Sequence, residues 1–388
     1  MSRVRLSARI FLVSAKRFGS FVLALAGAVF WISCGRASRE PGLRQYAFVT
    51  NEKSNTVTVV DLRSFQVRQT VPVGKNPTAI VASPIRNEVY VVNAGSENLA
   101  ILNAVTLQVD AWIPLGHAPS SLALSPNGEI GYATNSGSGN ITAMDLLKRK
   151  ILAVIPAGRD PGHAKVTPDG KLLAVSNRGD DTVSIIDLER MAKLADVKVG
   201  AQPGPLAILP DSSQLFVGNT GGNNISAVDL KSRKLITHLE SGKAPGDLVL
   251  KPDGGELLVT NSGSNSVTVV NTYADEVAEN LMAGSNPGRA IVNAAGSVLY
   301  FSNFGSNTVT AVDINNRKVF ASVSVGAHPG ALALTPDERY LLAIDNASND
   351  LAVVDTRTNS LFTMVPLGLL PRDLAVKAFN SPAGLDTR

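Results

Sequence analysis

The sequence predicts an all-β protein folded as a single eight-bladed β-propeller, with four-stranded antiparallel blades of 42 residues. Three observations predict it: a Gly-x-x-Pro pattern at a constant spacing, a series of polar residues in the same register, and strand-like segments inside every unit. Repeats of about 40 to 45 residues that contain several short strands are typical of propeller blades. The glycines of the pattern are Gly74, Gly116, Gly158, Gly200, Gly242, Gly284, Gly326 and Gly368. The polar series is Asn51, Asn93, Asn135, Asn177, Asn219, Asn261, Asn303 and Asp345.

The repeats set the domain boundaries. We expect an export signal over residues 1–33, a short linker over 34–44, the propeller over 45–378 and a C-terminal tail over 379–388. Hydrophobic residues make up 44% of the chain and charged residues 18%, which is the composition of a packed globular protein.

The first residues have the pattern of a bacterial export signal. A basic stretch ends at Arg17, an apolar run extends from Phe21 to Ile32, and Cys34 follows Ser33. A run of about 12 residues is short for a membrane span, which needs about 20. The position of Cys34, the only cysteine, resembles the lipidation site of bacterial lipoproteins. We therefore expect a periplasmic or cell-surface protein held to a membrane by lipid on Cys34, with a cleaved signal or an uncleaved anchor as alternatives.

The positive charge of the chain comes from this leader. The formal net charge is +4, but residues 1–33 contain five basic and no acidic residues. The remainder has 31 basic and 32 acidic residues, so no overall charge favours nucleic acid.

One repeat illustrates the predicted blade. Between Pro245 and Gly284, short strands are expected over residues 247–250, 256–260 and 266–270, followed by a longer fourth segment. Clusters of Gly, Pro, Asn and Asp separate them, as a four-stranded meander requires. The recurring Asn and Asp are expected to stabilise turns by hydrogen bonding nearby backbone N–H groups.

The two ends of the array predict how the ring closes. The array begins with three strands, over residues 46–50, 56–60 and 69–73, and ends with one strand over 373–376. Joining the last strand to the first three completes an eighth, composite blade and leaves the ring without an open end.

A ligand site is expected where the repeats differ from one another. The Gly-x-x-Pro links and the loops between second and third strands should share one face and surround the mouth of a central channel. Basic residues outnumber acidic ones there, which favours binding of carboxylate or phosphate groups. The alternative is that these loop positions are solvated and have no role. The candidate residues are Lys75, His117, Arg159, His163, Lys243, Asp247, Arg289, His328 and Arg372.

Catalytic and metal-binding signatures are missing from the sequence. Three histidines lie on mouth links, but His328 is about half a ring from His117 and His163, which argues against a three-histidine metal site. One of them could be an axial haem ligand. The haem-attachment, zinc-protease, serine-hydrolase and phosphate-loop motifs are all absent. A non-catalytic role is favoured, but missing motifs do not exclude an enzyme, because propeller sites are assembled from separate blades. We expect no metal and no cofactor, and no nucleic acid because aromatic residues do not alternate with the basic ones.

The repeats also resemble a known family. Tyr90-Val91-Val92-Asn93 and Leu258-Val259-Thr260-Asn261 are similar to the tetrapeptide of the YVTN β-propeller repeat, as is the segment Ser264–Asn271. The resemblance covers residues 45–378 and implies an exported surface or periplasmic protein. The superfamily is similar to the d1-haem propeller of nitrite reductase and to d1-haem assembly proteins, and more distantly to lactonases.

Three functions follow as expectations. The first is a monomeric, non-catalytic binding scaffold of the cell envelope, whose partner is a small anionic molecule, a glycan or an envelope protein. The second, implied by the resemblance, is an oxidoreductase or assembly protein that binds d1-type haem. The third is a lactonase-like hydrolase.

Overall fold

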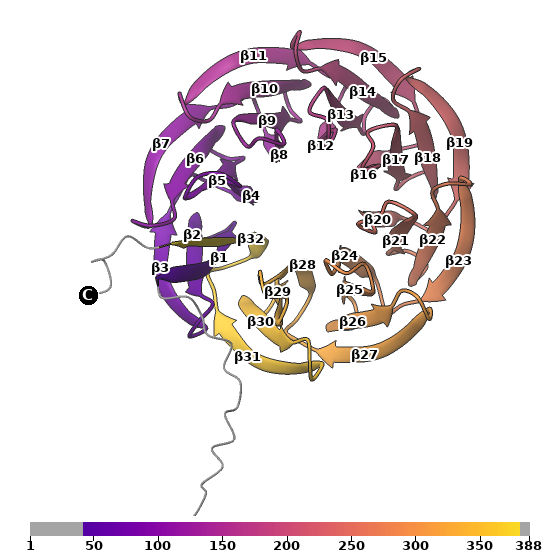
Figure 1. The fold of residues 1–388 in the computed structure, drawn as a ribbon. Coiled ribbons are helices and arrows are strands. Elements are labelled where there is room, and N and C mark those ends of the chain that lie inside the picture. The colour runs from indigo at the N-terminus through magenta and orange to yellow at the C-terminus, as the bar shows by residue number, and fades with distance from the viewer. Residues whose placement is uncertain (1–41, 381–388) are drawn as a thin grey trace, which may run out of the picture. The chain divides into compact units, whose positions relative to one another are not determined.

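The computed structural model describes residues 42–380, and all their regular secondary structure is β-strand. Thirty-two strands form eight four-stranded sheets, arranged as blades around a common centre (Figure 1). The predicted eight-bladed propeller is therefore confirmed. The expected export signal, Cys34, most of the linker and the tail beyond Asn380 lie outside the described residues. No helix able to cross a membrane is present between Gly42 and Asn380.

The blades are numbered here in chain order, beginning with the first uninterrupted one. Blade 1 contains β4 (Pro77–Ala82), β5 (Glu88–Asn93), β6 (Asn98–Asn103) and β7 (Gln108–Pro114). Blade 2 contains β8 (Pro119–Leu124), β9 (Ile130–Asn135), β10 (Asn140–Asp145) and β11 (Lys150–Pro156). Blade 3 contains β12 (Pro161–Val166), β13 (Leu172–Asn177), β14 (Thr182–Asp187) and β15 (Ala192–Lys198). Blade 4 contains β16 (Pro203–Ile208), β17 (Gln214–Asn219), β18 (Asn224–Asp229) and β19 (Lys234–Glu240).

The remaining blades repeat this order, except that the last is composite. Blade 5 contains β20 (Pro245–Leu250), β21 (Glu256–Asn261), β22 (Ser266–Asn271) and β23 (Glu276–Met282). Blade 6 contains β24 (Pro287–Val292), β25 (Val298–Asn303), β26 (Thr308–Asp313) and β27 (Lys318–Ser324). Blade 7 contains β28 (Pro329–Leu334), β29 (Tyr340–Asp345), β30 (Asp350–Asp355) and β31 (Ser360–Pro366). Blade 8 contains β32 (Pro371–Asn380), β1 (Leu43–Asn51), β2 (Thr56–Asp61) and β3 (Gln66–Pro72).

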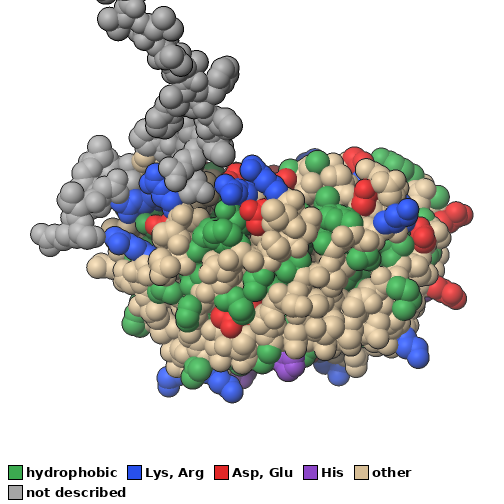
Figure 2. Space-filling view, turned by 90° about the horizontal axis from the view of Figure 1, so that it is seen from below, with side chains coloured by type: hydrophobic (Ala, Val, Ile, Leu, Met, Phe, Trp, Pro, Cys, Tyr) green, Lys and Arg blue, Asp and Glu red, His purple; other side chains and the backbone are tan. Residues whose placement is uncertain are grey.

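The core lies between adjacent blades. The two middle strands of each blade are buried on both faces, as in β5 and β6, because a neighbouring blade covers each face. This burial explains why those strands are apolar throughout instead of alternating. The outermost strands are half exposed and carry exposed hydrophobic side chains such as Trp112, Ile151 and Phe320. Figure 2 shows hydrophobic side chains scattered over one side of the propeller wall.

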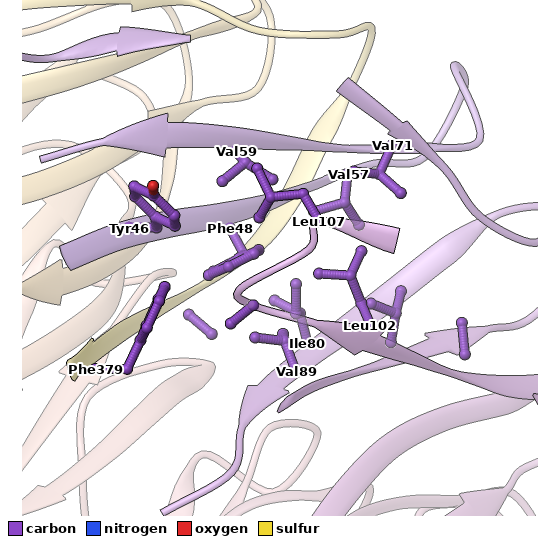
Figure 3. Close-up of a cluster of buried hydrophobic side chains, with 14 residues drawn as sticks. Tyr46, Phe48, Val57, Val59, Val71, Ile80, Val89, Leu102, Leu107 and Phe379 are labelled. Carbon is purple, nitrogen blue, oxygen red and sulfur yellow. The ribbon is translucent and has the colours of Figure 1, made fainter. Parts of the chain in front are cut away.

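The ring closes by antiparallel pairing of β1 with β32. The pairing runs from Leu43 opposite Asn380 to Asn51 opposite Pro371, with one irregularity after Val49. Behind it, Tyr46 of β1 lies edge-on against Phe379 of β32, with 5.5 Å between ring centroids. Figure 3 shows this contact within the hydrophobic cluster that joins blade 8 to blade 1.

The asparagine that ends the second strand joins three segments of the chain. Asn51 Nδ2 donates hydrogen bonds to Thr56 Oγ1 at 3.1 Å and Thr58 Oγ1 at 2.9 Å, and Asn51 Oδ1 accepts the Gly368 N–H at 3.1 Å. This side chain is completely buried, so it does more than the turn stabilisation expected from the sequence. It also explains the repeated glycine: a Cβ on Gly74 would lie 2.7 Å from the Cβ of Asn93.

The polar residue that ends the third strand caps the following turn, as the sequence predicted. Asp145 Oδ1 accepts the N–H groups of Leu147 at 3.0 Å and Lys148 at 2.8 Å. These hydrogen bonds, led by that of Lys148, lower the pKa of the Asp145 carboxyl.

Each Gly-x-x-Pro link is held between two blades. On the side of the preceding blade, Asn55 has a φ of 55°, and its Oδ1 accepts the Asn76 N–H at 2.9 Å. On the side of the following blade, Ser96 Oγ accepts the Lys75 N–H at 2.6 Å. The same pair of contacts recurs at the link of Lys243 and Ala244. The links are therefore fixed parts of the scaffold.

Candidate functional site

The links and the loops between second and third strands lie on one face of the propeller. In blade 1 the Gly95 N–H donates to the Lys75 carbonyl at 2.9 Å, and in blade 2 the Gly137 N–H donates to the His117 carbonyl at 3.1 Å. A cavity of about 720 Å³ opens inside this ring of loops, which we call the mouth cavity. Side chains from blades 1, 2, 3, 6, 7 and 8 line it.

Three of the nine predicted site residues line the mouth cavity: His163, Arg289 and Arg372. A fourth, Asp247, lies beside it, with its Oδ1 4.0 Å from Arg289 Nη1. The structure places the other five on the outer rim of the mouth: Lys75, His117, Arg159, Lys243 and His328.

The rim residues face solvent or pair locally. Lys75 and Lys243 are exposed. His117 Nδ1 lies 2.5 Å from Glu97 Oε1, and Arg159 Nε lies 2.5 Å from Asp180 Oδ1. These residues lie on the rim because they belong to the links. The backbone of a link is bound to both flanking blades, and its side chains extend outward.

Arg289 of blade 6 reaches groups from three other blades. Besides its contact with Asp247 of blade 5, its positive charge acts on two further groups. It adds to the effect of burial, which lowers the pKa of His163 in blade 3, and it opposes the effect of burial, which raises the pKa of Asp373 in blade 8. Half of its side-chain surface remains exposed. At 4.0 Å from Asp247 the guanidinium is beyond hydrogen-bonding distance, so its N–H groups are available to a ligand.

Two acidic residues of the mouth, Asp247 and Asp373, are occupied by the scaffold, whereas Asp160 lines the cavity near Arg178. Asp247 Oδ1 accepts the N–H of Leu248 at 3.0 Å, and its Oδ2 accepts that of Ala290 in the next blade at 3.0 Å. Asp373 occupies the same repeat position and accepts the N–H of Leu374 at 3.0 Å and of Ile80 at 3.1 Å. Burial raises the pKa of Asp373. Both carboxylates therefore bind one blade to the next. The predicted ligand residue Asp247 thus has a contact with the scaffold.

His163 and Lys165 of β12 supply nitrogen groups without partners. Among residues 42–380, neither the His163 imidazole nor the Lys165 amine takes part in a hydrogen bond or ion pair. Burial, with smaller effects of Arg289 and Arg178, lowers the pKa of His163 to about 4, so the imidazole is neutral at pH 7. Enclosure by protein also lowers the pKa of Lys165, although the charge of Asp247 opposes this effect.

Sequence reasoning missed Arg178, Phe304 and Asn346, which all line the mouth cavity. Arg178 is more than half exposed, and its Nε lies 3.8 Å from Asp160 Oδ2. Each of the three directly follows the residue of the polar series in its repeat. Comparing that position across the repeats would have found them, because it holds Glu52, Ala94, Ser136, Arg178, Thr220, Ser262, Phe304 and Asn346.

This arrangement is suited to holding an anion in a polar cavity. Arg178, Arg289 and Arg372 all present guanidinium groups to it, and Arg372 Nε also pairs with Glu52 Oε2 at 3.0 Å. Arginine recognises carboxylate and phosphate groups through paired N–H donors. In the part of the chain from 42 to 380, no three His, Cys, Asp or Glu side chains gather as metal ligands would.

Comparisons with known proteins agree with the architecture. Residues 109–292 match the family model described as YNCE-like beta-propeller. The chain is a β-propeller repeat protein. No curated protein sequence matches it.

Several solved structures share the propeller fold. Hydrazine synthase of Kuenenia stuttgartiensis has a TM-score of 0.61 at 23% identity, and the match covers 72% of this chain and 95% of that one. The dihydro-heme d1 dehydrogenase NirN, in complex with DHE, has a TM-score of 0.72 at 17% identity, covering 85% and 74%. A functionally unknown protein from Desulfotomaculum acetoxidans has a TM-score of 0.59 at 15% identity, covering 87% and 99%. At these identities the likeness concerns the fold.

Proposed function

We propose that this propeller is a non-catalytic binding protein of the cell envelope, whose mouth cavity takes a small molecule bearing carboxylate or phosphate groups. The observation that carries the proposal is Arg289. It projects among groups of blades 3, 5 and 8 and has no close ion-pair partner. A ligand anion would supply the hydrogen-bond acceptors that the scaffold does not.

The surrounding charges support the same ligand class. Arg178 is 3.8 Å from its nearest carboxylate, which leaves its donors available. The carboxylates of Asp247 and Asp373 are already engaged with backbone N–H groups. The Lys165 amine, on the same innermost strand as His163, adds a further cationic group. A glycan or an envelope protein, the other partners expected from the sequence, would bind to the rim residues instead.

Paired substitutions test the anion site. Arg178→Ala/Arg289→Ala should weaken binding of citrate, measured by isothermal titration calorimetry, by at least about thirtyfold, because a hydrogen bond to a charged group contributes about 2 kcal/mol. Lys75→Ala/Lys243→Ala removes the same charge from the rim and should leave the affinity nearly unchanged. Both variants should keep the melting temperature of the parent protein. Equal losses of affinity in the two variants would show that only general charge matters.

One observation favours a second candidate, a d1-type haem. His163 places a neutral, unpaired imidazole beside the cavity, and the arginines there suit the carboxylates of a tetrapyrrole. Such a group would supply redox chemistry when bound, while His163 would hold it and the arginines would orient it. NirN, a propeller of similar fold, is a dihydro-heme d1 dehydrogenase by its title. Added haem should then give visible absorption bands that His163→Ala shifts, and a spectrum unchanged by that substitution would count against this candidate.

A further inference from the structure

The mouth is asymmetric at the residue that follows each link proline. Three repeats have Thr78, Ser120 or Arg372 at this position, whereas blades 3 to 7 all have glycine: Gly162, Gly204, Gly246, Gly288 and Gly330. None of these five glycines has a positive φ. The backbone conformation therefore does not require glycine here.

Packing does not require glycine at every one of these positions either. A Cβ added to Gly162 or Gly246 would meet nothing nearer than 3.7 Å, which is an ordinary contact distance. Gly330 differs, because a Cβ there would collide with the Asn346 side chain. Where neither conformation nor space demands glycine, the missing side chains leave a strip of bare backbone along one side of the mouth.

A second pocket lies over this strip. It has a volume of about 360 Å³, and Gly246, Gly288 and Gly330 form part of its lining. It also shares Arg289, Phe304 and Gly330 with the mouth cavity, so the two spaces adjoin one another. We call this pocket the shelf.

Phe304 gives the shelf an aromatic side. It is the only aromatic residue at its repeat position, and 39% of it is exposed although it lies among polar mouth residues. Its ring stacks on the His328 imidazole, with 4.2 Å between centroids and an interplanar angle of 17°. Stacking on one side fixes the orientation of the ring and leaves the rest of Phe304 to line the shelf.

We propose that the shelf binds a planar unsaturated ring, and that the ligand of this protein is therefore a ring-bearing anion. The ring would lie along the glycine backbone against Phe304, and its carboxylate or phosphate would bind Arg289. Bare backbone allows a flat group to approach closely, and an aromatic side chain favours stacked or edge-on contact with it. This inference rests on the proposed anion site and names the class of its ligand.

A matched pair of probes tests the shelf. Naphthalene-2,6-dicarboxylate is planar, and decahydronaphthalene-2,6-dicarboxylate has the same carboxylates on a saturated, non-planar frame. Calorimetry should show that the planar acid binds about tenfold more tightly, since aromatic contacts add up to about that factor. Phe304→Ala should bring the planar acid to the affinity of the saturated one and leave the saturated acid unchanged. Leu369→Ala, which removes another exposed apolar side chain from the rim, should change neither.

A second variant fills the shelf without removing a contact. Gly246→Thr introduces the residue that blade 1 has at this position, where the scaffold tolerates it as Thr78. This substitution should weaken binding of the planar acid at least about tenfold and leave the melting temperature of the protein unchanged. Equal binding of the two acids to the parent protein, or an equal effect of Phe304→Ala on both, would overturn the shelf and leave the anion site standing. Failure of both acids to bind would instead refute the anion site.

Discussion

Asp345 ends the second strand of blade 7, a position at which the seven other blades have asparagine. In those blades the amide donates to the side chain five residues later, as Asn51 does to Thr56 at 3.1 Å and Asn93 to Asn98 at 2.9 Å. Blade 7 replaces the pair with two carboxyl groups, Asp345 and Asp350. A carboxylate cannot donate, so this contact requires a proton on one of the two.

The surroundings of Asp345 favour its protonated form. It is completely buried, and its Oδ1 and that of Asp350 have no other hydrogen-bond partner in the described structure. Burial, followed by the interaction with Asp350, raises the pKa of Asp345 to about 8. The Gly326 N–H, which donates to Oδ2 at 3.0 Å, only partly offsets this.

Stability should therefore fall as the pH rises from about 4 to about 8. Over this range the folded protein keeps a proton on Asp345 that the unfolded chain, with an ordinary value of 3.8, has released. Asp345→Asn restores the amide donor and should raise the free energy of unfolding at pH 9 by about 1–3 kcal/mol. Below pH 4 the gain should largely vanish. Urea denaturation at pH 4, 7 and 9 measures it.

Asp187 provides a control of opposite sign. Its turn hydrogen bonds, led by that of the Arg190 N–H, lower its pKa, so it stabilises the fold above the unfolded value and loses this effect as the pH falls. Asp187→Asn should thus destabilise the protein at neutral pH. A gain at pH 9 from both substitutions would contradict the assignment of the shared proton to Asp345.

At the scale of the strands, closure of the ring depends on contacts that no other blade has. Phe379 is buried at the end of β32 against Tyr46, beyond the last periodic repeat. Phe379→Ala should lower the free energy of unfolding by about 3–4 kcal/mol, because it leaves a cavity where the two ends of the chain meet. Chemical denaturation followed by intrinsic fluorescence measures the loss.

The control is an exposed phenylalanine on an outer strand. Phe320 of β27 is about half exposed, so Phe320→Ala should cost less than about 1 kcal/mol. Similar losses in the two variants would mean that closure contributes no more than an ordinary surface contact.

The sequence was most informative about strands that repeat. Proline begins the innermost strand of every blade, and Asn or Asp ends the second and third, so each boundary carries a chemical signal. The closing strands were predicted over residues 46–50 and 373–376, but they extend over Leu43–Asn51 and Pro371–Asn380. At the outer end of this pair, residues 43–45 are paired with residues 378–380, where the other blades have no strand, and so no periodic signal marks these residues.

At the scale of the whole molecule, the repeat located the mouth but not the directions of its side chains. Lys75 and Arg289 are both basic residues of the mouth, yet Lys75 extends to solvent from a link and Arg289 lines the cavity from an innermost strand. Composition cannot separate them. Their difference follows from backbone hydrogen bonds between blades, which appear only in three dimensions.

The expected location of the protein remains a prediction from residues outside the described structure. If Cys34 carries a lipid, Cys34→Ser should move the protein from the membrane to the soluble fraction of a bacterial host that exports it. Ser33→Ala, which keeps the cysteine, should leave it membrane-bound. Fractionation followed by immunoblotting measures the distribution. A membrane-bound Cys34→Ser protein would favour an uncleaved anchor.

The links are tied to both neighbouring blades through their backbone N–H groups. Because these ties use backbone N–H groups of the link, the side chains of the link residues can be exchanged while the contacts between blades are kept. Paralogues could thus acquire new specificities by point substitution alone, at constant chain length. The ring would then serve as a constant frame on which the rim residues vary.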